Sequence, residues 1–573
     1  MAGRAGGAMM AEASEDYFNI AQTLTAAAQD DPNRLAVVDR RSPDAKGRTV
    51  ITYAQLAEDS SRLAGGLLGC GLEPGDRVVV MVPMGLDFFV TAFALFKARL
   101  VPVMVDPGMG LKRFLLCLSE GKPQGVIGVP LVHLACFLWP KYFATVKKRI
   151  VLCRLPGFLN RLPALFGLKK FSKLLTDYPA LPEQKTKSDE AAAILFTSGA
   201  TGPAKGAVYT HAMFRAQVES IAKNFGFKFG GVDMATFPLF ALFAPALGLT
   251  SVIPNMNPIK PGQADPKKLL QSLSAEKCDS LFGSPALLSR LADYGQEREL
   301  KLKGVRLIVT AGAPVQPTLA ARVGDLLEPG GHLVTPYGAT EGMPLTTVDH
   351  EEIVGARGMT EQGFGMCVGR ALPGIRMAIL PIGDQPMSKF KEEQILPVGE
   401  IGEIAASGPV VCQNYFERPK ETALTIVTGP DGEIWRRMGD LGWQDAQGRF
   451  WFCGRKSQRV VTEQGSYFTV CCESIFNNHP KVRRSALVGV GQSGRQKPVM
   501  VVEPSQRLKK NDWRDLVEEL KKLGQANPRT RSIETFLRHY SFPMDIRHNA
   551  KIGREKLAVW ATKRLAEGDR GAY

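Results

Sequence analysis

The segment TSGATGPAKG at 197–206 has the residue types that hold phosphate groups. Its glycines let backbone N–H groups approach a phosphate closely, its hydroxyls donate further hydrogen bonds, and Lys205 adds a positive charge. It is not a Walker A loop, because Gly206 follows the lysine where that motif needs serine or threonine. A flexible glycine-rich turn with no ligand is the alternative interpretation.

The residues on either side of this segment predict the elements that would position it. Ala193 to Phe196 form a short apolar run that is typical of a buried strand. After a second short strand, we expect a helix to begin after Thr210, since apolar residues recur at helical spacing from Phe214 to Phe225. A polar loop fixed between two strands favours phosphate binding over a free turn.

Three further segments carry residues suited to a nucleotide site: TPYGATEG at 335–342, MGDLGWQDAQGRFWFCGR at 438–455 and RHNAKIGREKL at 547–557. Each has a structural alternative when it is taken alone. A tyrosine such as Tyr337 in an apolar motif is usually core, and Asp440 in a G-D-x-G turn usually caps that turn. Lys551 in a basic tail is by default a solvated charge.

Short apolar runs alternate with helical periodicity along much of the chain. Residues 76–83 predict a buried strand, Leu86 to Lys97 a helix, and 305–314 another buried strand that ends in a glycine turn. This alternation is typical of an α/β fold with parallel strands.

The pattern changes in the last third of the chain and predicts two domains. Residues of about 370–455 predict short strands between glycine and aspartate turns, which indicates a small β-rich subdomain. A compact α+β unit is expected after it. We therefore predict an N-terminal domain at 1–455 and a C-terminal domain at 456–573.

The composition is that of a globular protein with an excess of positive charge. The 573 residues are 45% apolar and 22% charged, which excludes a fibrous or wholly disordered chain. The net charge of +16 suits an anionic partner such as a nucleic acid, an acidic membrane surface or a phosphorylated substrate. No nucleic-acid-binding motif accompanies this charge, so we expect no nucleic-acid partner.

The ten cysteines form no C-x-x-C pair and predict buried free thiols in a reducing compartment. The seven histidines form no H-x-x-x-H or H-x-H set, so a zinc site is not expected. The N-terminal residues lack the apolar core of a signal peptide, and no clean membrane span is evident. We expect a cytoplasmic protein.

Residues 121–176 contain ten Lys or Arg and no Asp or Glu, together with aromatic and leucine-rich runs. One interpretation is a basic surface over ordinary buried helices. The other is an amphipathic patch that contacts an anionic membrane or admits an apolar substrate. The sequence leaves both open.

Taken in order, the four polar segments resemble the signature motifs of the adenylate-forming superfamily, which includes acyl-CoA synthetases, luciferases and peptide-synthetase adenylation domains. The resemblance covers residues of about 30–570. It implies a large N-terminal ATP- and acyl-binding domain of stacked α/β sheets with a small β subdomain, followed by a smaller, mobile α+β domain. It also implies ATP as a substrate and Mg²⁺ as the metal.

The resemblance assigns roles to the residues that match its motifs. Those implied to hold the β- and γ-phosphates are Thr197, Ser198, Gly199, Thr201, Gly202 and Lys205. Those implied to pass along the adenine and acyl pocket are Gly312, Ala313 and Pro314. Tyr337 would stack on adenine, Thr340 would contact the α-phosphate, and Glu341 would hold Mg²⁺.

Three more residues complete the implied site. Asp440 would accept hydrogen bonds from both ribose hydroxyls, and Arg455 would lie near the ribose and phosphates. Lys551 would reach the α-phosphate and the substrate carboxylate, although its context HNAKI differs from the usual S-G-K. The catalytic residues implied in this way are Lys205, Thr340, Glu341 and Lys551.

Three departures from the acyl-CoA ligase pattern bear on the second step. Ala241 stands where many of these ligases have a histidine near the acyl carbonyl, and Gln458 stands at the usual aspartate of the hinge. The segment leading to Glu473 lacks the usual proline and is one residue longer. These changes weaken the case for a standard CoA thioester step.

As a set, the motifs are most similar to the olefin β-lactone synthetases of bacterial long-chain olefin biosynthesis. That resemblance implies a long-chain 2-alkyl-3-hydroxyalkanoic acid substrate whose β-hydroxyl closes on the adenylated carboxyl group, since proximity replaces a second substrate. It also implies assembly with the condensing enzyme, the reductase and the β-lactone decarboxylase of the same pathway.

Three alternatives stay open from the sequence. A long-chain fatty acyl-CoA ligase, or an acyl-AMP ligase that loads a carrier protein, would share the first step. A non-catalytic adenylate-binding protein is disfavoured by the intact Lys205, Glu341, Asp440 and Lys551. A nucleic-acid-binding module rests on the net charge alone.

Overall fold

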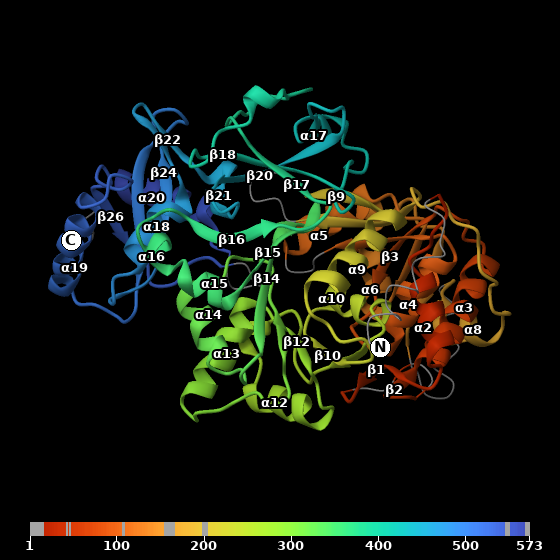
Figure 1. The fold of residues 1–573 in the computed structure, drawn as a ribbon. Helices are drawn as coiled ribbons and strands as arrows, with labels where there is room; N and C mark the ends of the chain where they lie inside the picture. Colours follow the sequence, from red (N-terminus) through yellow and green to blue (C-terminus); the bar gives the residue numbers. More distant parts are fainter. Residues whose placement is uncertain are drawn as a thin grey trace.

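The computed structural model describes residues 16–41, 44, 47–105, 109–153, 167–197, 204–544 and 551–567. Figure 1 shows an α/β body at the N-terminal end, antiparallel strands beside it, and a smaller C-terminal body at the other end. Within the described residues the strands form sheets of fourteen, seven, three and two strands. The predicted fold class is therefore confirmed.

The seven-stranded sheet is the N-terminal layer and has the order β7-β6-β5-β3-β4-β8-β9, all pairs being parallel except β8 with β9. Its strands are β3 (Arg77–Met81), β4 (Val101–Val105), β5 (Gly125–Gly128), β6 (Lys148–Val151), β7 (Lys169–Lys170), β8 (Ala191–Thr197) and β9 (Lys205–Thr210). The strand predicted at 76–83 is β3, and that predicted at 193–196 lies in β8.

The helices of this region follow from local sequence signals. The predicted helix from Leu86 to Lys97 is α4, which is apolar on all sides and buried along most of its length. The helix expected after Thr210 is α9 (His211–Asn224), and the Thr210 side chain caps it by accepting a hydrogen bond from the Met213 N–H at 3.2 Å. The others are α2 (Gln22–Asp30), α3 (Tyr53–Gly69), α5 (Leu111–Glu120), α6 (Pro130–Leu138) and α8 (Phe171–Thr176).

The fourteen-stranded sheet joins a parallel part to an antiparallel part. The parallel part has the order β14-β13-β12-β10-β11-β1, with β2 antiparallel at its edge. Its strands are β1 (Leu35–Asp39), β2 (Val50–Thr52), β10 (Val232–Ala235), β11 (Thr250–Ile253), β12 (Ser280–Phe282), β13 (Leu307–Val309) and β14 (His332–Ala339). The strand expected at 305–314 is thus shorter, because the chain turns at Gly312, where φ is +98°.

From β14 onward the same sheet is antiparallel. These strands are β15 (Gly342–Asp349), β16 (Met366–Ala371), β17 (Arg376–Leu380), β18 (Gly402–Ser407), β19 (Ile426–Thr428), β20 (Ile434–Gln444) and β21 (Phe450–Arg455). Helices along this half of the chain are α10 (Pro238–Ala241), α11 (Phe243–Ala246), α12 (Pro266–Ala275), α13 (Pro285–Gln296), α14 (Pro317–Gly324), α15 (His350–Gly355), α16 (Arg357–Glu361) and α17 (Pro419–Ala423).

The C-terminal body has its own sheet and core. Its strands are β22 (Val460–Thr462), β23 (Gly465–Tyr467), β24 (Val482–Val490), β25 (Lys497–Pro504) and β26 (Thr535–Arg538), and its helices are α18 (Thr469–Asn477), α19 (Lys510–Gln525) and α20 (Arg554–Ala566). Trp513, Leu516 and Phe476 are fully buried within it. The domain boundary at 455/456 stays a prediction.

All ten cysteines are free thiols, and Cys153 alone among them is not fully buried. In the described part of the chain, no three or more His, Cys, Asp or Glu side chains gather as a metal site. Every helix found there is too short or too polar to cross a bilayer.

Candidate functional site

A cavity of about 2180 Å³ lies where both large sheets and the C-terminal body meet. Most residues predicted for the site line it: Lys205, Gly312, Ala313, Pro314, Tyr337, Thr340, Glu341, Asp440, Arg455 and Lys551. Thr197 is the last residue of β8 and pairs with Lys205 of β9. Ser198, Gly199, Thr201 and Gly202 lie outside the described residues.

Thr340 and Glu341 form the two-residue turn between β14 and β15, in which Ala339 pairs with Gly342. The turn is tight, since a Cβ on Gly338 would lie 2.3 Å from the carbonyl oxygen of Gly342. Two neighbours fix it: the Tyr209 hydroxyl donates to the Thr340 carbonyl, and the Cys412 N–H donates to the Glu341 carbonyl at 2.7 Å. Both side chains are therefore held at the cavity wall.

Tyr415 connects the charged groups around this turn, and the sequence analysis did not identify it. Its hydroxyl donates to Glu341 Oε1 at 2.8 Å. Lys205 Nζ lies 5.2 Å from the centre of its ring, and the Arg436 guanidinium lies 4.5 Å from it. Burial and the Glu341 charge raise the pKa of Tyr415, so its hydroxyl stays a neutral donor. The stretch QNYFERP around it matches no chemical motif.

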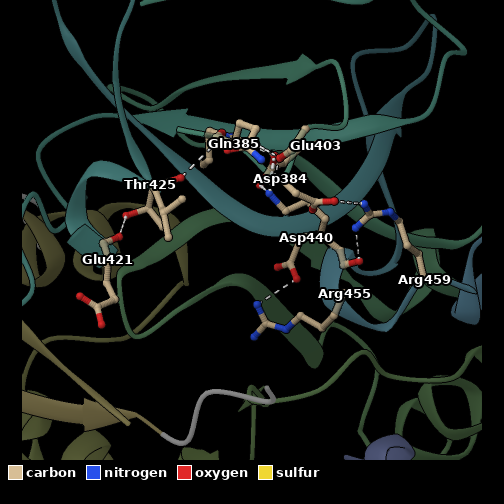
Figure 2. Close-up of polar contacts among 12 residues, drawn as sticks. Asp384, Gln385, Glu403, Glu421, Thr425, Asp440, Arg455 and Arg459 are labelled. Carbon is tan, nitrogen blue, oxygen red and sulfur yellow. Dashed lines mark hydrogen bonds and ion pairs between the residues drawn. The ribbon is translucent and has the colours of Figure 1, made fainter. Parts of the chain in front are cut away.

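Asp440 lies on β20, opposite Arg455 of β21. Its carboxylate is 3% exposed and accepts a hydrogen bond from the Tyr337 hydroxyl at 2.9 Å through Oδ2. Arg455 forms an ion pair with Oδ1 at 3.0 Å, but the geometry is not that of a hydrogen bond, so Oδ1 lacks an aligned donor. Figure 2 shows this ion pair. An acceptor with an open lone pair at a cavity wall fits a ribose hydroxyl.

Opposing influences act on the pKa of Asp440. Burial raises it, while Arg455, the Tyr337 hydrogen bond and the charge of Lys551 each act to lower it. Lys551 lines the same cavity as Asp440 and lies just before α20. The carboxylate of Asp440 is thus influenced by Tyr337, which precedes it in the sequence by more than ninety positions, and by Lys551, which follows it by more than ninety.

An apolar wall borders the polar one. Phe240 stacks on Phe282 with ring centres 3.9 Å apart, and Phe237 and Phe243 lie next to them. Ala241 is fully buried in the core and does not line the cavity. The position that many acyl-CoA ligases fill with histidine therefore carries no group that could reach a bound carbonyl.

Gln458 and Glu473, where the sequence departs from the acyl-CoA ligase pattern, contact the same arginine. Arg554 of α20 donates to both carboxylate oxygens of Glu473, at 2.8 and 2.6 Å, and to Gln458 Oε1 at 3.3 Å. Gln458 in turn donates to Glu555 at 2.9 Å, and the Leu487 N–H donates to Glu473. Glu473 is buried by these contacts, and its charge is already paired in this arrangement.

A second ion cluster supports the strand that carries Asp440. Glu403 of β18 accepts hydrogen bonds from Arg437 of β20 at 2.9 and 2.6 Å, and it forms an ion pair with Lys456 at 2.9 Å. Figure 2 shows Glu403 close to Asp384, which accepts a hydrogen bond from Arg459 at 2.5 Å. Glu403 and Arg437 are almost fully buried, so each charge depends on the other.

The combined arrangement can bind a polyanion that has an apolar extension. Lys205, Arg436, Arg455 and Lys551 bring positive charge to one wall, and the phenylalanines supply the apolar wall. Such a cavity suits a nucleoside triphosphate beside a fatty acid.

Comparison with known proteins gives a consistent result. The model of the AMP-binding enzyme family matches residues 24–416. The chain is 42% identical to the olefin beta-lactone synthetase of Xanthomonas campestris pv. campestris, covering 95% of this chain and 98% of that protein. It is 41% identical to the olefin beta-lactone synthetase of Stenotrophomonas maltophilia, covering 96% and 98%.

Among solved structures, the fold is similar to that of O-succinylbenzoate coenzyme A synthetase from Bacillus subtilis in complex with ATP and magnesium ion. The TM-score is 0.72 at 19% identity, covering 93% of this chain and 98% of that one. At this identity the likeness concerns the fold alone.

We predict that Glu403→Gln lowers the free energy of unfolding by about 3–5 kcal/mol, because it leaves the buried Arg437 and the half-buried Lys456 beside a neutral group. Chemical denaturation followed by tryptophan fluorescence measures this change. Glu518→Gln is the matched control, since Glu518 pairs with Lys521 on the exposed face of α19 and its loss should have little effect. Equal stability of both variants would show that the cluster is not needed.

Proposed function

The chain belongs to the AMP-binding enzyme family, and we propose that it is an ATP-dependent β-lactone synthetase. The proposed substrate is a long-chain 2-alkyl-3-hydroxyalkanoic acid. The observation that carries this proposal is the identity of 41–42%, over nearly the whole length, with two proteins named olefin beta-lactone synthetase. The polar and apolar walls of the large cavity support it.

ATP would lie along the polar wall. Lys205 and the segment around it would hold the β- and γ-phosphates, and the ring of Tyr337 would stack on adenine. The hydroxyl of Tyr337 donates to Asp440 and orients that carboxylate. The face of the Tyr337 ring is not used by this hydrogen bond and would stack on adenine. Asp440 Oδ1 would accept from a ribose hydroxyl, with Arg455 beside it.

The residues present also fit Mg²⁺, which we propose Glu341 holds together with the phosphates. Mg²⁺ is commonly bound by one or two carboxylates plus substrate phosphates and water, so a larger protein cage is not required. Bound there, the ion would neutralise charge on the phosphates. Tyr415 would keep Glu341 directed at the cavity by its hydrogen bond.

The first step forms an acyl-adenylate. An oxygen of the substrate carboxylate attacks the α-phosphorus of ATP, and the bond to the bridging oxygen breaks as pyrophosphate departs. The negative charges that meet at this centre oppose the reaction, so stabilisation by nearby cations supplies most of the catalysis. Lys551 would hold the α-phosphate and the carboxylate, and Thr340 would donate to the α-phosphate.

In the second step the substrate's own β-hydroxyl oxygen attacks the acyl carbon and closes a four-membered ring. The carbon–oxygen bond to AMP breaks, AMP keeps the electron pair, and the hydroxyl proton is released. A nucleophile within the same molecule needs no second binding site. The buried Ala241 and the ion-paired Glu473 are consistent with a site not built around a CoA thiol.

The product is a strained ring with two alkyl chains. We propose that this chain works beside the reductase that supplies the hydroxyl group and the β-lactone decarboxylase that consumes the ring. A cytoplasmic location is part of the same proposal.

The proposed function is tested by product analysis without CoA. With ATP, Mg²⁺ and a long-chain 2-alkyl-3-hydroxy acid, we expect AMP and pyrophosphate in equal amounts and the proton signals of a β-lactone by NMR. The matched substrate is the same acid without its hydroxyl group, which should be adenylated without forming a lactone. Turnover that requires CoA and yields a thioester would instead indicate an acyl-CoA ligase.

Lys551→Ala should lower the rate of acyl-adenylate formation by roughly two to four orders of magnitude, because a cation at the reacting phosphate is lost. ATP–pyrophosphate exchange measures this step alone. Lys563→Ala, in the last turn of α20, is the control and should retain exchange. We expect the fold to be unchanged, since Lys551 is exposed and outside the packed helix. Exchange at the unsubstituted rate would contradict the assignment.

Tyr337→Phe should move the acid limb of the pH–rate profile to higher pH. The hydroxyl donates to the charged form of Asp440 and so lowers its pKa. Its loss raises that pKa, and the carboxylate that must accept from ribose becomes protonated at a higher pH. We expect KM for ATP to rise first on acidification. An unchanged acid limb would show that ionisation of Asp440 does not control nucleotide binding.

A further inference from the structure

Helix α6 presents an apolar face to solvent. Leu131, Leu134, Phe137 and Leu138 have exposed fractions of 72%, 51%, 74% and 56%. The spacing of Leu131, Leu134 and Leu138 places them on one stripe of the helix, with Phe137 beside it. The opposite face, with Val132 and Cys136, is buried in the core. The helix contains no charged residue, which is unusual for a helix at a protein surface.

We call this apolar face the α6 face, and α5 exposes apolar residues as well. Leu111 and Leu116 of α5 are also exposed, and both helices contact the short 3-10 segment η2 (Pro140–Phe143). These six residues are among the few large apolar side chains that the described part of the chain exposes, and they lie within 28 positions of sequence. Exposed apolar residues that gather in this way usually mark an interaction surface.

The charge around the α6 face is positive. Lys112 in the first turn of α5 and Lys141 in η2 are exposed, and residues 121–176 include no acid. The nearest acid in sequence, Glu120, forms an ion pair with Arg418 at 2.6 Å. Trp139 and Tyr142 are half-buried beside the face, as amphipathic rings are at a membrane–water interface.

We propose that the α6 face, with Leu111 and Leu116, docks this protein on the surface of an anionic lipid membrane. The leucines and Phe137 would enter the boundary between headgroups and acyl chains, and Lys112 and Lys141 would contact the anionic headgroups. A protein partner of ordinary composition would need polar groups across the interface, and α6 offers none in its exposed stripe. The combination of apolar centre and basic edge fits lipid.

The α6 face lies near the large cavity, so docking on a membrane would bring the cavity close to the lipid. Met109 and Arg113, on either side of Leu111, line the large cavity. An apolar acid that partitions into a membrane would therefore meet the protein next to one end of its binding cavity. This last point rests on the proposed function, whereas the docking itself does not.

Vesicle flotation of the full chain tests the proposal. We expect binding to vesicles of phosphatidylcholine with phosphatidylglycerol, weaker binding to phosphatidylcholine alone, and loss of the difference at high salt. The double variant Leu134→Ser/Phe137→Ser should bind about tenfold or more weakly, since two apolar side chains no longer leave water. Val398→Ser/Val559→Ser is the matched control, because those residues are equally exposed elsewhere, at 59% and 60%.

A variant of changed charge measures the electrostatic contribution to membrane binding. Lys141→Glu should weaken binding to the anionic vesicles by about fivefold or more, and Lys268→Glu on α12 makes the same change of net charge away from the face and should not. The proposal is overturned if the unsubstituted chain does not float with anionic vesicles, or if the serine variant floats as well as its control. It is also overturned if the chain ignores vesicles and forms an oligomer that the serine variant dissociates, which would make the face an interface between copies.

Discussion

The nucleotide end of the cavity depends on keeping one buried carboxylate paired. A charge removed from water costs several kcal/mol unless it finds partners, and Asp440 is 3% exposed. Its partners come from two other strands: Tyr337 on β14 and Arg455 on β21. Arg455 is a direct neighbour because β21 pairs with β20, whereas β21, β16 and β15 lie between β20 and β14 in the strand order. The hydrogen bond from Tyr337 thus joins strands that are not neighbours, at the end of the cavity that we propose binds ribose.

The segment 411–416 joins that sheet to the N-terminal one. The Cys412 N–H donates to the Glu341 carbonyl of the fourteen-stranded sheet, and the Phe416 N–H donates to the Gly206 carbonyl of the seven-stranded sheet. Between them, Tyr415 contacts Glu341 and lies near Lys205. The proposed metal-binding carboxylate and the phosphate-binding lysine are therefore set relative to each other by one tyrosine.

The C-terminal body is attached to the rest of the chain by apolar packing and by hydrogen bonds. Cys471 of α18 lies in the same core cluster as Cys453 of β21, and the Asn527 side chain donates to the Gln362 carbonyl at 3.0 Å. Within this body, Arg554 at the start of α20 donates to Glu473 at 2.6 Å and to Gln458 at 3.3 Å, and Lys551 precedes this helix by three residues. This contact holds Lys551 at the cavity wall where its charge acts on Asp440. The same contact pairs the charge of Glu473 with Arg554. In the proposed reaction the substrate's own hydroxyl group supplies the nucleophile of the second step.

The sequence alone determined much of this protein. Apolar runs and helical spacing predicted β3, α4, β8 and α9, because local periodicity and capping by Thr210 are short-range properties. The residues of the motifs were located by resemblance, and the structure brings most of those it describes to one cavity.

Only the tertiary structure determined which side chains contact each other over long separations in the sequence. The role of Tyr415, the open lone pair of Asp440, the buried Glu403 cluster and the paired Glu473 each depend on side chains from distant strands. The exposure of α6 belongs here as well. Its sequence is apolar on all sides, and composition cannot distinguish a helix buried on every side from one that leaves its outer face in water, because that depends on whether another element packs against it.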